Sequence, residues 1–338
     1  MTSIAIFIDR AMLPGAHVVL LTALMHHGPE TLDIHVFQSG LTPSETADLR
    51  RTLDNTGRPF RLTTVPFDPS GHFQRFSGLH GSQMTYGRLL LPELLPDHKK
   101  VLYLDADLLI LTDLQRVFQT DLSGYPLGAV ATATFEFSLD RQLASSRGIP
   151  GDAPHFNAGV LLFDLDQWRS HRLTNSCLVF AVENSSAMQS HDQSALNFVL
   201  RGRFKRLSSS LNVCVEPWNR DSHPGARILH FIGSPKPFDP GARWLHAHRR
   251  QFEAWFRRTA SWRQVPPASR ILDGVRRLWR TRRSIARCLF NSVGLLRQKL
   301  ARHVPSIFAR WLYGLRIVSV NPRTDLSIAR HASMDVAR

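Results

Sequence analysis

Two aspartates one residue apart, Asp105 and Asp107, directly follow a short apolar run at residues 100–104. Side chains two residues apart on an extended chain point the same way, so this spacing predicts that both carboxylates converge at the carboxyl end of a strand. That end is where open α/β sheets bind their ligands. Two carboxylates held close together repel each other unless a cation lies between them, and oxygen ligands suit Mg²⁺ or Mn²⁺. The pair therefore predicts a divalent-metal site.

The chain before this pair alternates between strand and helix signals. Apolar and polar periodicity predicts strands at 4–8, 34–37 and 61–65, a fourth strand ending at Asp105, and helices at 18–26, 43–55 and 83–95. Thr42-Pro43-Ser44-Glu45 has the form of a capping box with proline at the first helical position, which marks the start of a helix. This alternation predicts a mostly parallel sheet with helices on both faces.

The pattern is looser after residue 112. Buried strands are predicted at 129–133, 160–163 and 228–231, and helices at 175–183 and 192–200. Between the first two of these strands, residues 135–154 are polar and contain several Gly, Ser and Pro residues. We expect this stretch to be a substrate-facing loop.

Three polar patterns follow the acid pair in order along the chain. They are Phe156-Asn157-Ala158-Gly159-Val160, His191-Asp192-Gln193, and residues 230–238 with the sequence His-Phe-Ile-Gly-Ser-Pro-Lys-Pro-Phe. A lone Asp-x-Asp occurs often by chance, whereas the ordered set is specific. Together with the acid pair, the set resembles glycosyltransferase family 8, which includes glycogenin-like enzymes and bacterial lipopolysaccharide galactosyl- and glucosyltransferases. The resemblance covers about residues 1–250.

The resemblance implies a GT-A fold, which is an α/β architecture with a Rossmann-like, mostly parallel central sheet. It also implies retaining transfer of a hexose from a UDP-hexose donor with Mn²⁺, for which Mg²⁺ is the alternative. The site residues that it implies fall into three groups. They are the metal ligands Asp105, Asp107 and His230, the donor contacts Asp9, Arg88, Asp105, Ala106, Gly233 and Lys236, and the reaction-centre residues Asn157, Asp192 and Gln193.

The chemistry of these side chains agrees with those roles. Lys236 adds a positive charge where negative charge builds up on a leaving diphosphate, and Gly233 allows the backbone to approach a phosphate closely. The imidazole of His230 suits Mn²⁺ better than Mg²⁺. The carboxamide of Gln193 is a weak nucleophile, which favours front-face attack by the acceptor and leaves a covalent intermediate open.

Each assignment has a structural alternative. For the Asp105/Asp107 pair, the alternative is an acid at a strand end and an acid that caps a helix. Asp192 and Gln193 could simply cap the helix that follows them, and Asn157 could belong to a turn. His230 could be a hydrogen-bonded core histidine, and Arg88 could be a solvated side chain. The match is also incomplete after the first strand. There, Asp9 is followed by Arg10-Ala11-Met12, where the family has Asn and Tyr residues that hold uracil. Stacking of Arg10 on a base is the alternative.

The net charge of +15 is concentrated at the C-terminal end. Residues 241–338 contain 20 Arg and one Lys against four acids, whereas residues 1–240 are close to neutral. From Arg270 onward, apolar residues recur at helical spacing among the arginines, which is typical of an amphipathic helix that binds an anionic membrane surface. Nucleic-acid binding needs charge but no apolar stripe, so no nucleic-acid partner is expected. A solvated tail is the structural alternative.

The sequence also indicates where in the cell the protein is located. Three scattered cysteines indicate reduced thiols, and we find no signal-peptide pattern and no apolar run long enough to span a membrane. We therefore predict a GT-A catalytic domain at 1–260 and a helical, membrane-associating tail at 261–338, in a cytoplasmic protein on the inner face of the membrane. The predicted acceptor is a saccharide or glycolipid, such as lipopolysaccharide. The alternative is a non-catalytic, membrane-tethered protein that binds nucleotide sugars.

Overall fold

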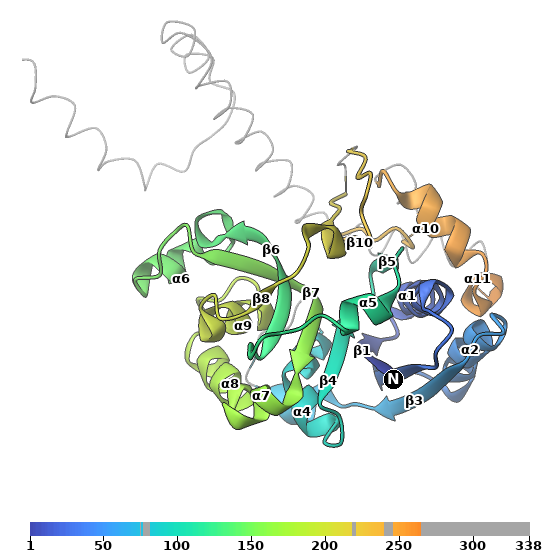
Figure 1. The fold of residues 1–338 in the computed structure, drawn as a ribbon, viewed down its shortest axis with the longest axis horizontal. Coiled ribbons are helices and arrows are strands. Elements are labelled where there is room, and N and C mark those ends of the chain that lie inside the picture. Colours follow the sequence, from blue (N-terminus) through green and yellow to red (C-terminus); the bar gives the residue numbers. More distant parts are fainter. Residues whose placement is uncertain (75, 77–81, 218–220, 240–245, 265–338) are drawn as a thin grey trace, which may run out of the picture. The chain divides into compact units, whose positions relative to one another are not determined.

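A seven-stranded sheet forms the centre of the computed structural model, which describes residues 1–74, 76, 82–217, 221–239 and 246–264. The strand order is β3-β2-β1-β4-β7-β6-β8. Figure 1 shows β1 and β4 at the middle of the molecule. The strands are β1 (Thr2–Asp9), β2 (Leu32–Ser39), β3 (Phe60–Pro66), β4 (Lys100–Leu104), β6 (Leu127–Thr134), β7 (Pro154–Asp164) and β8 (Lys205–Arg206). Among these seven, β7 is antiparallel to both of its neighbours, while the other adjacent pairs are parallel. The predicted mostly parallel α/β sheet is confirmed.

A second, three-stranded sheet lies beside the first. It consists of β5 (Leu108–Ile110), β10 (Ile228–His230) and β9 (Val213–Cys214), in the order β5-β10-β9. β10 is antiparallel to β5 and parallel to β9. Because β5 follows β4 after a short turn, this second sheet starts at the carboxyl end of a central strand of the first.

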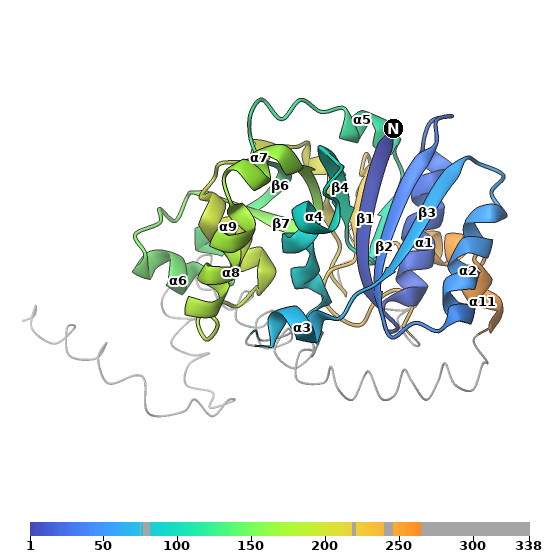
Figure 2. The same cartoon turned by 90° about the horizontal axis from the view of Figure 1, so that it is seen from below.

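Side chains on the two faces of β1 pack into two different hydrophobic clusters. Ile4, Ile6 and Ile8 belong to the cluster that contains most of the apolar residues of α1, while Ala5 and Phe7 belong to the cluster on the opposite face. All five are buried. A strand buried on both faces reads as a continuous apolar run, as expected for a parallel sheet covered by helices on both sides. Figure 2 shows α1 and α2 on one side of the sheet and α4, α8 and α9 on the other.

The helices fall between the strands in the order expected for an α/β protein. They are α1 (Leu13–His26), α2 (Pro43–Asp54), α3 (Pro69–Phe73), η1 (Met84–Leu90), α4 (Leu91–Leu94), α5 (Leu114–Phe118), η2 (Phe135–Phe137), α6 (Arg141–Ser146), α7 (Leu165–Ser170), α8 (Leu173–Glu183), α9 (Asp192–Leu200), η3 (Ser209–Leu211), α10 (Arg249–Phe256) and α11 (Ala260–Gln264). The capping box of α2 forms as predicted, because the Thr42 hydroxyl accepts from the Glu45 N–H and the Glu45 carboxylate accepts from the Thr42 N–H.

Two stretches differ from expectation. The helix predicted at 83–95 is a 3₁₀ helix, η1, followed by the single α-helical turn of α4. Pro92 has no backbone N–H and so interrupts the hydrogen bonding of a continuous α-helix over this stretch. Gly87 lies very close to β1, since a Cβ there would be 2.3 Å from the Phe7 ring. The loop expected at 135–154 contains η2 and α6.

The C-terminal end of the described chain packs on the main body. The backbone N–H of Ala260 in α11 donates to the Thr52 hydroxyl of α2 at 3.0 Å. The predicted basic tail lies outside the described residues from 265 onward, so its helical form and its boundary at residue 260 stay predictions. Within the described part of the chain, we find no helix that has both the length and the apolar character needed to cross a membrane.

Candidate metal and donor site

The acid pair lies in the turn that connects the two sheets. Asp105 follows the last residue of β4, and Ala106 and Asp107 turn the chain into β5. The argument from alternation along one strand is therefore wrong, since neither carboxylate lies within a strand. The turn is fixed by close packing against α1, where a Cβ on Gly15 would be 2.1 Å from the carbonyl oxygen of Ala106. The turn, and not a strand, brings the two carboxylates together.

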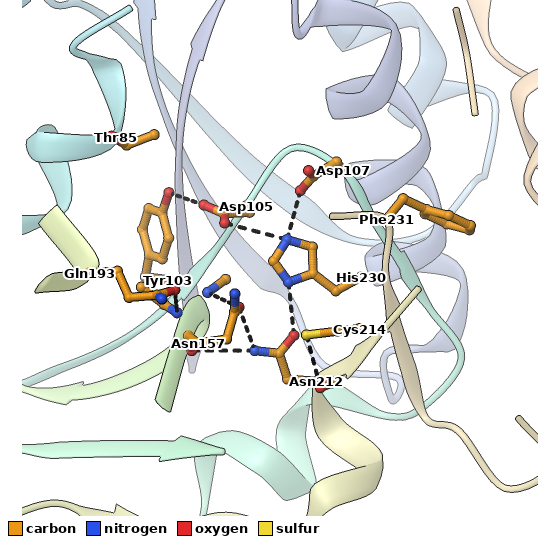
Figure 3. Close-up of polar contacts among 12 residues, drawn as sticks. Thr85, Tyr103, Asp105, Asp107, Asn157, Gln193, Asn212, Cys214, His230 and Phe231 are labelled. Atoms are coloured by element: carbon orange, nitrogen blue, oxygen red, sulfur yellow. Dashed lines mark hydrogen bonds and ion pairs between the residues drawn. The ribbon is translucent and has the colours of Figure 1, made fainter. Parts of the chain in front are cut away.

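His230 reaches the acid pair from the second sheet. It is the last residue of β10 and lies opposite Leu108 of β5, and the N–H of Phe231 donates to the Asp107 carbonyl at 3.0 Å. Its Nε2 atom lies 3.2 Å from Oδ1 of Asp107 and 3.6 Å from Oδ2 of Asp105 (Figure 3). One ligand atom from each of the three side chains falls within 4.8 Å of the others. The structure thus brings together the three predicted metal ligands.

The donor atoms of this group fit a divalent cation. Oδ1 of Asp107 is buried and has no hydrogen bond, although Nε2 of His230 is nearby. Oδ1 of Asp105 already accepts from Arg88 at 2.9 Å and from the Tyr103 hydroxyl, which leaves Oδ2 facing His230. Two carboxylate oxygens and one imidazole nitrogen around a shared point form a ligand set that Mn²⁺ accepts. A buried oxygen without a donor is the kind of atom that a cation would satisfy.

Charges around Asp107 and His230 stabilise each other. Burial opposes the charged form of Asp107, but Lys236 and His230 outweigh that effect and lower the pKa of Asp107. Burial likewise lowers the pKa of His230, but Asp107 outweighs it and raises the pKa of His230 to about 10. Without metal, the site therefore holds a charged Asp107 carboxylate beside a protonated His230 ring, and binding of a divalent cation would release the proton from Nε2 of His230.

Gly159 of β7 makes room for His230. A Cβ at this position would lie 2.2 Å from Cε1 and 2.5 Å from Nδ1 of the His230 ring. Contacts this short do not occur, so any larger residue at position 159 would displace the imidazole. The glycine of the Asn157-Ala158-Gly159 pattern is thus required by the histidine, a role that the sequence did not reveal.

A chain of hydrogen bonds orients the His230 ring. The N–H of Gly159 donates to Oδ1 of Asn157 at 2.9 Å, and Nδ2 of Asn212 donates to the same oxygen at 3.0 Å. The remaining amide atom of Asn212, Oδ1, lies 2.9 Å from Nδ1 of His230. Because this oxygen can only accept, Nδ1 carries the hydrogen and Nε2 faces the carboxylates. Asn212, whose side chain is buried, was not among the predicted site residues, and no local pattern identifies it.

Replacing Asn212 with alanine is expected to weaken binding of Mn²⁺ by about 10- to 100-fold, the usual cost of losing a partner that orients a metal ligand. The ring of His230 would lose the acceptor that fixes its tautomer, while the three ligands themselves would remain. Titration of the full chain with Mn²⁺, followed by electron paramagnetic resonance, measures the change. Asn175→Ala, at an exposed position on α8, is the matched control. Equal affinity in both variants would contradict the orienting role.

Lys236 lies directly beside the acid pair. Its Nζ atom donates to Oδ2 of Asp107 and, at 2.8 Å, to the carbonyl of Phe231. Gly233, three residues earlier, has a φ of +71°, in the left-handed region that favours glycine. The loop after β10 therefore places a cationic side chain at the same carboxylate that faces His230.

Arg88 connects two of the predicted site residues. Its buried guanidinium contacts Oδ1 of Asp105 at 2.9 Å and Oδ2 of Asp192 at 3.0 Å, and lies over the Tyr103 ring at 4.3 Å. Burial lowers the pKa of Arg88, but the two carboxylates outweigh it and raise that pKa. The alternative of a solvated Arg88 is wrong. The helix-cap alternative for Asp192 is also wrong, because His191 precedes α9 at the cap position and the Asp192 carboxylate pairs with Arg88.

The remaining predicted residues have local partners. Oε1 of Gln193 accepts from the Ala158 N–H at 3.0 Å, which ties the start of α9 to β7. Asp9, at the end of β1, accepts from the Met12 N–H at 3.1 Å. Arg10 pairs with Glu45 of α2 at 2.9 Å, so its guanidinium is engaged at the edge of the molecule.

This architecture defines a class of protein. A mostly parallel sheet with one reversed strand and helices on both faces is the architecture of GT-A glycosyltransferases, and here the acid pair lies at the end of a central strand. The model of the family described as Glycosyl transferase family 8 matches residues 3–240. The chain belongs to glycosyltransferase family 8, as the motifs predicted.

Individual relatives support this assignment. General stress protein A of Bacillus subtilis is 24% identical over 71% of this chain and 86% of its own length. Glycosyltransferase GlyF of Streptococcus pneumoniae is 26% identical over 70% of this chain, but the match covers 57% of GlyF. Among solved structures, the galactosyltransferase LgtC in complex with donor and acceptor sugar analogs superimposes with a TM-score of 0.66 at 25% identity, over 80% of this chain and 99% of LgtC. These comparisons confirm the GT-A fold.

Proposed function

We propose that this glycosyltransferase moves a hexose, galactose or glucose, from a UDP-sugar to a saccharide acceptor, with retention of the anomeric configuration and with Mn²⁺ as its metal. The observation that carries the proposal is the convergence of Asp105, Asp107 and His230 at the turn between the two sheets. Membership of family 8 and similarity to LgtC, a galactosyltransferase solved with donor and acceptor sugar analogs, support the donor and acceptor classes.

In this proposal, the three converging side chains hold the metal and Lys236 supplies a further positive charge. When bound, a divalent cation there neutralises charge on the diphosphate of the donor. Lys236, fixed beside Asp107, adds stabilisation as negative charge develops on the leaving group. Gly233, with its positive φ, lets the backbone of the same loop approach a phosphate closely. The Ala106 backbone between the two acids lies at the same edge.

The reaction centre is proposed to be the region of Asn157, Asp192 and Gln193. Arg88 holds Asp192 and Asp105 in a fixed relation, so that the sugar-binding side chains and the metal ligands are positioned by one guanidinium. The carboxamide oxygen of Gln193 is tied to the Ala158 N–H and is weakly nucleophilic. Direct front-face attack by the acceptor hydroxyl, with the diphosphate leaving from the same side, is therefore the favoured route to retention.

The acceptor is proposed to be a membrane-borne glycan such as a lipopolysaccharide core. The support is the concentration of arginine at the C-terminal end, with apolar residues at helical spacing between them. Binding of this tail to anionic lipid would place the enzyme on the inner face of the membrane, where lipid-linked acceptors are built.

A panel of nucleotide sugars tests the proposed function. With Mn²⁺ present, we expect hydrolysis of UDP-galactose or UDP-glucose to exceed that of the other donors. We also expect the released hexose, read by proton NMR before it mutarotates, to have the anomeric configuration of the donor. A donor with another base as the best substrate would contradict the UDP assignment, and an inverted product would contradict retention.

The region after β1 favours a second candidate, a protein that binds nucleotide sugars without catalysis. Arg10 pairs with Glu45, and Asp9 closes the turn after β1, where the family has residues that hold uracil. Calorimetry with UDP, in the presence and absence of Mn²⁺, together with the donor panel separates the two candidates. UDP binding without turnover of any donor in the panel would favour the binding protein.

A further inference from the structure

A second group of metal-binding side chains lies at the opposite end of the central sheet. Asp33 and His35 are two residues apart on β2, and so point to the same side of the sheet, and His98 lies in the turn just before β4. Both strands flank β1 and run parallel to it. The three residues therefore gather at the amino ends of the strands, while Asp105 and Asp107 lie at the carboxyl end of β4.

The three side chains meet through their metal-binding atoms. Oδ2 of Asp33 lies 3.0 Å from Nε2 of His35 and 3.2 Å from Nε2 of His98, and the two imidazole rings are perpendicular with centroids 4.8 Å apart. One ligand atom from each residue falls within 4.8 Å of the others. The edges of a tetrahedral zinc site are about 3.3–3.6 Å long, given bonds of about 2.0–2.2 Å to nitrogen and oxygen. The two measured spacings, 3.0 and 3.2 Å, are slightly shorter, so a small outward shift of the side chains would admit the ion.

Burial and charge at this cluster favour a cation. Asp33 is 2% exposed, and its Oδ1 atom is buried without a hydrogen-bond partner. The Oδ2 atom of Asp33 faces both imidazoles. His35 is also buried, with an exposed fraction of 7%. The cluster therefore combines a buried carboxylate with a buried imidazole.

We propose that Asp33, His35 and His98 bind a Zn²⁺ ion, with one coordination position left for water. Two imidazoles and one carboxylate form a ligand set that Zn²⁺ prefers and that Mg²⁺ and Ca²⁺ do not. In the zinc complex both rings present Nε2 to the ion and carry their hydrogen on Nδ1. The ion joins the start of β2 to the turn that leads into β4, the strand that ends at Asp105. The proposal does not depend on the proposed function.

The competing account is a triad held by hydrogen bonds alone. Oδ2 of Asp33 would then accept from both imidazoles and from the Ser3 hydroxyl, which lies 3.2 Å away. In that account the ring hydrogens stay on Nε2, and added zinc leaves the cluster unchanged. The two accounts differ in the state of the ring nitrogens, which can be measured directly.

Zinc titration of the full chain, with His98→Gln and the control His171→Gln, tests the proposal. His98 is the most exposed of the three residues, with 26% of its side chain accessible, and His171 is exposed on the surface after α7. We expect calorimetry to show a zinc site that is present in the wild type and in His171→Gln and is weakened more than about 100-fold in His98→Gln, a greater loss than removal of an outer-shell partner causes. Identical isotherms for all three proteins would overturn the proposal.

A measurement on the wild-type chain avoids dependence on folding of the variant. With ¹⁵N-labelled histidine, addition of one equivalent of Zn²⁺ is expected to shift the Nε2 resonances of His35 and His98 and to move their ring hydrogens to Nδ1. Unchanged resonances at these two rings, while those of His230 shift, would assign all zinc binding to the first site and overturn the proposal.

Discussion

Replacing Asp107 with alanine is expected to lower the metal-dependent rate of donor cleavage by about 10³-fold, a loss at the upper end for removal of one strong electrostatic contact at a reacting centre. The carboxylate has two partners, since one oxygen faces His230 at 3.2 Å and the other accepts from Lys236. Alanine would therefore remove a proposed metal ligand and also leave His230 and Lys236 without the acid that holds them.

The measurement is hydrolysis of the preferred UDP-sugar at increasing concentrations of Mn²⁺. Asp54→Ala, at an exposed position at the end of α2, provides the control for loss of an acid. Mn²⁺-dependent activity that persists in Asp107→Ala at a tenth or more of the wild-type rate would rule out this carboxylate as a ligand. Circular dichroism of both variants separates loss of the site from loss of the fold.

Gly159→Ala is expected to weaken Mn²⁺ binding by at least about 100-fold, although it adds only one methyl group. That methyl group would lie 2.2 Å from Cε1 and 2.5 Å from Nδ1 of His230, so the ring must leave the position in which it faces the acid pair and contacts Asn212. Displacement of a metal ligand costs at least as much as loss of the partner that orients it, for which 10- to 100-fold is usual.

Gly71→Ala is the matched control, because a Cβ there would meet no atom closer than 3.8 Å and the residue does not have a positive φ. Mn²⁺ affinity, measured by electron paramagnetic resonance, should fall in Gly159→Ala and stay unchanged in Gly71→Ala. If the Mn²⁺ affinity of Gly159→Ala were unchanged, Mn²⁺ binding would not depend on the position that the His230 ring occupies here.

Elements set by local patterns were predictable from the sequence. The apolar run of β1, with Ile4, Ile6 and Ile8 on one face and Phe7 on the other, identified a strand covered on both sides. The Thr42 capping box fixed the start of α2 to the residue. Both signals depend on neighbours a few residues apart, and so they can be read without knowledge of the fold.

Features set by contacts between distant elements were not predictable in the same way. The turn that carries Asp107 depends on the approach of Gly15 in α1, and the need for Gly159 arises from a ring 71 positions further along the chain. Asn212 has no motif at all, because its role is defined by partners on β7 and β10. Arg88 was implied by the family resemblance, but its link between Asp105 and Asp192 could only be seen in three dimensions.

The acid pair occupies the junction of the large and the small sheet, while His230 ends a strand of the small one. An ion bound there would connect the two sheets. Its binding would depend on the register between β10 and β5, because that register places His230 opposite the acid pair. Mutations that loosen this pairing, even far from the donor, should therefore appear in assays as a higher demand for metal.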